Sequence, residues 1–87
     1  MNDMHKKKAE LLKALGHPIR FCIVEGLSLG EQNVAAMVEC TKVPQPTVSQ
    51  HLNILKAAGI IQGHREGNQM LYSVCSNEAR KIVLSLK

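Results

Sequence analysis

Side chains suited to reading nucleic acid gather in the segment from Gln45 to Gly59. Val48, Leu52 and Leu55 recur at helical spacing as one apolar stripe, which predicts a short amphipathic helix. On its opposite side lie Pro46 and the polar residues Ser49, Gln50 and Asn53, with the charged Lys56 at the edge. Ser, Gln and Asn donate and accept hydrogen bonds, as base edges in a DNA major groove require. The pattern is typical of a recognition helix, but a solvated surface helix would share it, so the flanking segments must decide.

Two residues mark the ends of this helix. Pro46 suits the first helical position, where the missing backbone N–H costs nothing. Gly59 suits the left-handed residue just past the last turn.

The composition bounds the class of protein. The chain has 87 residues, which favours a single domain, and its net charge of +4 favours contact with phosphates or an acidic surface. Three cysteines without a C-x-x-C pair argue against a disulfide framework and for a reducing compartment. No apolar run approaches the ~18 residues that span a bilayer, and the N-terminus does not resemble a secretory signal. We expect a soluble cytoplasmic protein with no membrane partner.

The elements that must position the polar helix follow from periodicity. Apolar spacing predicts three earlier helices, at residues 2–15, 18–28 and 33–41. The apolar stripe of the first is formed by Ala9, Leu12 and Leu15. A turn at 41–45 joins the third of them to the polar helix, which makes a helix-turn-helix. Val43 is expected to fill the angle between the two helices.

The second half of the chain changes its period. Alternation predicts a β-hairpin, with strands at 60–65 and 69–75 and a turn at 66–68. Asn77 is expected to cap a last helix over 78–86. The predicted fold is therefore mainly α with a small β-hairpin, a single winged helix-turn-helix domain over residues 1–87.

Four stretches resemble the ArsR/SmtB family of transcriptional repressors. They are LKALGHPIR at 12–20, QPTVSQHL at 45–52, LKAAGII at 55–61 and REGNQMLY at 65–72. The likeness extends from about residue 9 to residue 84. It implies a homodimer in which helices 2–15 and 78–86 form the interface. It also implies recognition helices in successive major grooves of a palindromic double-stranded DNA, and an inducer that releases the DNA.

The resemblance assigns roles along the polar helix. Ser49 and Gln50 lie where the family contacts bases, and Gln45, Thr47 and Asn53 flank them. Gln50 replaces a His that many members carry, and Pro46 replaces a Ser, so the preferred DNA sequence stays open. His51 lies beside the apolar stripe, where helix packing is favoured over base contact.

The hairpin tip carries further candidates. His64, Arg65, Asn68 and Gln69 lie there, and Arg65 is the strongest candidate for a contact to the DNA backbone or minor groove. A solvated hairpin charge is the alternative for Arg65, and Lys56 would face either phosphate or solvent.

The metal sites familiar in the family are not expected. The thiolate site needs cysteines at the positions that Asn33 and Ala35 occupy here. The second site needs carboxylate and His ligands in the last helix, where Glu78 is the one plausible ligand. The remaining histidines and cysteines show no zinc-like spacing. We predict neither a metal nor a cofactor.

Three cysteines are candidates for sensing an oxidant through their thiols. Some relatives sense oxidants with one cysteine in the second helix and one in the last. Cys22 lies three residues before the matching position, Glu25. The last helix has no cysteine, so Cys75 at the end of the second strand is the nearest substitute, and Cys40 ends the third helix. A small buried hydrophobic residue is the favoured interpretation of each, and a thiol sensor is the alternative.

We therefore predict a DNA-binding transcriptional regulator, a homodimeric repressor whose inducer is not identified. The alternatives are a winged-helix protein-interaction module, since fold does not fix function, and the thiol-sensing repressor. An enzyme is not expected, because no nucleophile–base pair, phosphate loop or metal set is visible.

Overall fold

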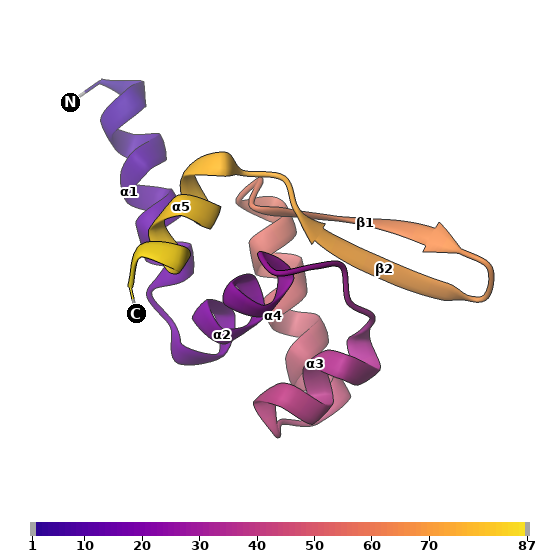
Figure 1. Cartoon of the computed structure of the whole chain (residues 1–87). Helices are drawn as coiled ribbons and strands as arrows, with labels where there is room; N and C mark the ends of the chain where they lie inside the picture. The colour runs from indigo at the N-terminus through magenta and orange to yellow at the C-terminus, as the bar shows by residue number, and fades with distance from the viewer. Residues whose placement is uncertain (1, 87) are drawn as a thin grey trace.

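The computed structural model of the chain describes residues 2–86. Within this range lie five helices and one antiparallel hairpin: α1 (Asp3–Leu15), α2 (Pro18–Leu27), α3 (Val34–Thr41), α4 (Gln45–Ala57), β1 (Ile61–Glu66), β2 (Gln69–Val74) and α5 (Asn77–Ser85). The two ends of the chain lie on one side of the molecule, and the hairpin extends from the other side (Figure 1). The winged helix-turn-helix order predicted from the sequence is confirmed. None of the described helices is long and apolar enough to cross a membrane.

Helix α2 lies at the centre of the packing. It contacts α1, α3, α4, α5 and β2. Val24 and Leu27 of α2 are buried together with Met37 of α3, Leu55 of α4 and Ile60. Because every other helix packs on α2, the apolar stripe of α4 is held against an aliphatic core and its polar face is turned outward.

Helix α4 has the predicted stripe and a slightly different start. Val48, Leu52 and Leu55 are buried, as predicted. The helix begins at Gln45 after Pro44, so Pro46 is the second helical residue and not the first. Its missing N–H still falls in the first turn, where backbone N–H groups have no partner within the helix.

The end of α4 is a Schellman motif. Gly59 has a φ of 75°, which confirms the left-handed conformation predicted for it. The Ile60 N–H donates to the Leu55 carbonyl and the Gly59 N–H to that of Lys56, each at 3.0 Å. These bonds stop the helix and turn the chain directly into β1.

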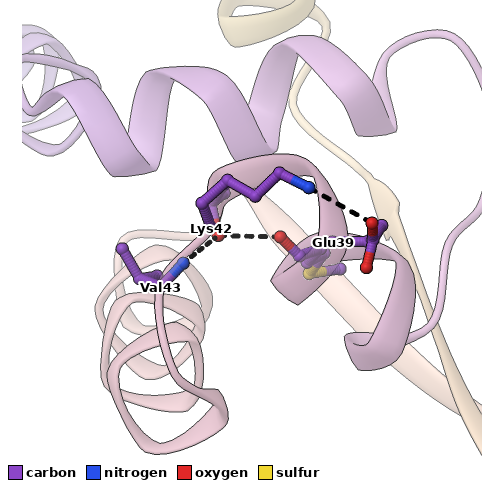
Figure 2. Close-up of polar contacts among 5 residues, drawn as sticks. Glu39, Lys42 and Val43 are labelled. Carbon is purple, nitrogen blue, oxygen red and sulfur yellow. Dashed lines mark hydrogen bonds and ion pairs between the residues drawn. The ribbon is translucent and has the colours of Figure 1, made fainter.

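The turn of the helix-turn-helix is held by side chains of α3 (Figure 2). The Thr41 hydroxyl donates to the Met37 carbonyl at 2.7 Å and accepts from the Val43 N–H at 3.4 Å. Lys42 adopts a φ of 62° and forms an exposed ion pair with Glu39 at 3.2 Å. Val43 packs against the core, as predicted.

The wing is a two-residue hairpin. Glu66 pairs with Gln69, so Gly67 and Asn68 form the loop. Gly67 has a φ of 64°, which is the positive angle that a type II′ turn needs at its first central position. The strands begin and end within one residue of the predicted bounds.

The start of the last helix corrects one prediction. Ser76, not Asn77, is the N-cap, and its hydroxyl accepts from the Ala79 N–H at 3.1 Å. Both residue types are good N-caps, so their order in the chain could not decide between them. The extended backbone of Ser76 does decide, because it places the hydroxyl under the first turn.

Candidate nucleic-acid interface

The outer face of α4 is open. The candidate side chains of Gln45, Gln50, Asn53 and Lys56 are exposed, and those of Thr47 and Ser49 are half-buried. Within residues 2–86, the side chains of Gln50 and Asn53 form no hydrogen bond with the rest of the chain. Their amide groups are therefore available to an outside partner.

A polar cluster links the end of α1, the start of α2 and α4. The Arg20 guanidinium donates through Nε to the Ala14 carbonyl at 2.7 Å and contacts Nδ1 of His51 at 3.2 Å. The rings of His17 and His51 lie 4.5 Å apart, tilted by 42°. The packing role predicted for His51 is confirmed, and Arg20 is a positioning residue that sequence reasoning missed.

The same cluster changes the titration of His51. Burial lowers the pKa of His51, and the neighbouring His17 and Arg20 lower it further. These causes act together because each disfavours a second positive charge between α2 and α4. The imidazole is therefore favoured in its neutral form in the folded chain.

His17 has a local structural role. Its Nδ1 accepts from the Ile19 N–H at 3.1 Å, so His17 caps the start of α2.

Within the described part of the chain, two of the candidate side chains on the wing make polar contacts with other residues and two do not. Arg65 and Asn68 are exposed near the tip. Gln69 instead accepts from the Asn33 side chain at 2.9 Å, and His64 lies 3.5 Å from carboxylate oxygens of both Glu31 and Glu66. Of the four tip candidates, Arg65 and Asn68 thus remain available for a partner.

Two of the cysteines meet across α2 and α3. The Sγ atoms of Cys22 and Cys40 lie 3.9 Å apart, whereas Cys75 donates to the Gly59 carbonyl at 3.5 Å. Cys40 and Cys75 are exposed, so their interpretation as buried hydrophobic residues was wrong. Cys40 lies on the outer face at the end of α3, and Cys75 follows the last residue of β2.

The reactivity of the Cys22 thiol is restrained. Burial raises its pKa, and the hydrogen bond and charge of Cys40 and the charge of Glu25 raise it further. A raised pKa lowers the thiolate fraction at neutral pH.

The two positions of the thiolate metal site serve other roles. Asn33 caps α3 by accepting from the Ala36 N–H at 2.9 Å, and Ala35 is exposed. Sequence reasoning missed a separate group, formed by Glu31, His64 and Glu66, whose ligand atoms lie within 4.8 Å of one another. The i, i+2 spacing of His64 and Glu66 on one strand was the visible signal, but nothing in the sequence brought Glu31 to them.

Apolar side chains are exposed on the first helix and after the last. Met4 is 65% exposed, Leu12 55% and Leu86 60%. The predicted stripe of α1 is therefore only partly covered within one chain, since Leu15 is buried and Leu12 is not.

Comparison with known proteins places this geometry in a family. Residues 17–62 match the sequence profile described as bacterial regulatory protein, arsR family. The chain belongs to the arsR family. The matched region of this arsR-family chain runs from the cap of α2 to the start of β1, so it contains the whole helix-turn-helix.

Individual members of the arsR family extend the likeness. The transcriptional repressor SmtB of Mycobacterium tuberculosis is 47% identical over 75 residues, which cover 86% of this chain but only 56% of that repressor. The crystal structure of the repressor BigR from Xylella fastidiosa is 35% identical, with a TM-score of 0.86 over 99% of this chain and 93% of that one. A homodimeric winged helix-turn-helix DNA-binding domain from Mycobacterium bovis, described as a possible ArsR-family regulator, is 26% identical, with a TM-score of 0.85 over 99% of this chain and 83% of that one.

Proposed function

We propose that this arsR-family chain is a transcriptional repressor that binds double-stranded DNA as a homodimer. The observation that carries the proposal is the open outer face of α4, whose Gln50 and Asn53 amides have no partner within the described chain. That face follows the turn of a helix-turn-helix, the arrangement that presents a helix to the major groove. The repressors among its relatives support the same function.

The proposed DNA contacts fall into two groups according to their position, those to base edges and those to the DNA backbone or minor groove. Ser49 and Gln50 read base edges, with Gln45, Thr47 and Asn53 beside them. Lys56, Arg65 and Asn68 contact the backbone or the minor groove, because they lie at the end of α4 and at the wing tip.

The proposed dimer uses residues 2–15 and 78–86. Exposed Met4, Leu12 and Leu86 supply apolar surface that a partner copy can bury. The homodimeric neighbour from Mycobacterium bovis supports association into a homodimer. A two-fold dimer would place its recognition helices on half-sites about one helical turn apart.

The proposal includes a cytoplasmic location and no enzymatic activity. Both follow from a regulatory role on DNA and from the repressors among the relatives.

A titration of purified protein with the DNA upstream of its own coding sequence tests the function. Binding should be tighter than to scrambled DNA, and the logarithm of the binding constant should fall linearly with the logarithm of the salt concentration. Equal binding to both DNAs, or none at low salt, would favour the alternative of a protein-interaction module.

One contact between cysteines supports the alternative of a thiol-sensing repressor, in which oxidation is the signal that releases DNA. The Cys22 and Cys40 thiols lie 3.9 Å apart, close enough to be oxidised to one disulfide across α2 and α3. Such a link would join the central helix to the first helix of the helix-turn-helix. Of the three cysteines considered as oxidant sensors, Cys22 and Cys40 are therefore the proposed pair.

A further inference from the structure

The imidazole of His64 and the carboxylate of Glu66, both on wing strand β1, converge with the carboxylate of Glu31 from the segment before α3. None of the three is among the proposed DNA contacts. Nε2 of His64 lies 3.5 Å from an oxygen of Glu31 and 3.5 Å from an oxygen of Glu66. The three ligand atoms lie within 4.8 Å of one another. From this geometry we propose that Glu31, His64 and Glu66 form a binding site for a divalent cation of the zinc class.

The distances fit a shared ion better than hydrogen bonds. N–H···O bonds have donor–acceptor distances of roughly 2.7–3.2 Å, so contacts at 3.5 Å are long for either carboxylate. Ligand atoms ~2.0–2.1 Å from a tetrahedral zinc lie about 3.3–3.4 Å from each other. The two N···O separations of 3.5 Å are close to that edge, and all three ligand atoms lie within 4.8 Å of one another.

The chemistry of the ligands selects the class of metal. Imidazole suits zinc and its transition-metal neighbours, whereas oxygen ligands alone would favour magnesium or calcium. One nitrogen and two carboxylate oxygens match a three-ligand zinc site whose fourth position is taken by water. The cation would also offset the repulsion between the two carboxylates.

The backbone brings the three exposed ligand residues together before any ion binds. His64 and Glu66 are two residues apart on β1, so both side chains project from the same face of the hairpin. Residues 31–33 are fastened to the hairpin by an isolated bridge, in which Gln32 and Tyr72 exchange backbone bonds of 3.2 and 2.9 Å. The Asn33–Gln69 side-chain bond adds a further link.

The site is distinct from both metal positions that the family resemblance indicated. A bound cation would join the segment just before α3 to β1. It would therefore restrict movement of the wing relative to the helix-turn-helix. This inference does not depend on DNA binding, because the site is complete within one chain.

Calorimetric titration of the metal-free full chain with zinc, under reducing conditions, tests the site. We expect one zinc per chain, with the dissociation constant raised by at least ~10–100-fold in Glu31→Gln and in His64→Gln. His5→Gln and Glu39→Gln are matched controls, since both alter exposed residues outside the cluster and should leave zinc affinity unchanged. A variant with Cys22, Cys40 and Cys75 all changed to Ser should also bind as the parent does.

A measurement on the parent protein alone guards against misfolded variants. Zinc should shift the NMR signals of the His64 ring and of amides 31 and 64–66 in a saturable manner. The proposal is overturned by absence of zinc binding, by equal affinities of His64→Gln and His5→Gln, or by loss of binding in the cysteine variant. Signal changes confined to residues around the thiols would overturn it as well.

Discussion

Gln50 and Arg65 are both exposed, but their positions predict different losses of DNA binding. Gln50 lies on the α4 face proposed to read base edges, so Gln50→Ala should reduce discrimination between operator and random DNA by roughly 1–3 kcal/mol. Arg65 lies near the wing tip, so Arg65→Ala should weaken binding to both DNAs and lower the salt slope by about one. Competition titrations at several salt concentrations measure both effects.

The control for Gln50→Ala is Gln62→Ala, which removes an exposed glutamine from β1. It should change neither the discrimination between operator and random DNA nor the salt slope. A uniform and equal loss in Gln50→Ala and Arg65→Ala would show that reading and anchoring residues were divided wrongly.

His51 predicts a pH dependence of stability. Its folded pKa is lowered by burial and by His17 and Arg20, whereas an unfolded histidine titrates near pH ~6.5. As pH falls below about 6.5, the unfolded chain binds a proton that the folded chain resists, so the free energy of unfolding decreases. His51→Gln should flatten this decrease. Urea unfolding at pH values from neutral to mildly acidic measures it.

His5→Gln supplies the control, because His5 is exposed on α1 and outside the cluster. An identical pH dependence in the parent and in His51→Gln would contradict the assignment.

Residue roles that follow from helical geometry were predictable from the sequence. The place of His51 beside the apolar stripe predicted its packing role. A glycine just past the last turn of α4 predicted the left-handed backbone of Gly59. The exposure of Cys40 was not predictable, because cysteine is often a buried residue and carries no surface signal. Its contact with Cys22 depends on how α3 crosses α2.

At the scale of elements, the wing turn depends on one glycine. Gly67 has a φ of 64° in open space, so Gly67→Ala meets no atoms but places a Cβ in a left-handed conformation. That conformation costs roughly 1–2 kcal/mol. Thermal unfolding should show the loss, since β1 and β2 pack against α4 and α5.

Gly30→Ala is a matched control, because no atom lies within 4 Å of its added Cβ and its φ is not positive. Equal stability of the two alanine variants would mean that the turn relaxes to another type at no cost.

The contact between α2 and α3 predicts which cysteines form a disulfide. Oxidised glutathione should first form a mixed disulfide with Cys22 or Cys40 and release one glutathione thiol. The second cysteine should then displace the other glutathione and close the Cys22–Cys40 bond. Because the pKa of Cys22 is raised, the reaction should accelerate as pH rises. Peptide mapping by mass spectrometry identifies the pair.

Cys75 contacts a carbonyl and no second thiol, so it should remain reduced or carry glutathione. A disulfide that includes Cys75 within one chain would contradict the geometry.

The elements themselves were predictable because each has its own period and end signals. The helical stripes, the period-two strands and Gly67 gave the order of elements, and most bounds agree within about a residue. What the sequence could not supply was the junction between residues 31–33 and the hairpin. That junction uses backbone groups of Gln32 and Tyr72, which every residue type carries.

At the scale of the whole molecule, large apolar side chains are exposed on α1 and after α5. Leu12 and Leu15 belong to the same predicted stripe, yet Leu15 is 4% exposed and Leu12 is 55% exposed. A domain this small covers only part of its apolar surface by itself, and association is the common remedy. The predicted stripe of the first helix thus serves two surfaces, one within the chain and one proposed between copies.

The proposed dimer predicts a two-chain species at micromolar concentration in sedimentation velocity. Leu12→Glu should raise the dissociation constant by at least ~10-fold, equivalent to ~1.4 kcal/mol, because association would remove a carboxylate from water. Leu29→Glu is the matched control: Leu29 is 80% exposed beyond the end of α2 and lies outside the proposed interface. The control should therefore remain dimeric. A parent chain that stays monomeric even on DNA, or a dimer unaffected by Leu12→Glu but broken by Leu29→Glu, would place the interface elsewhere or remove it.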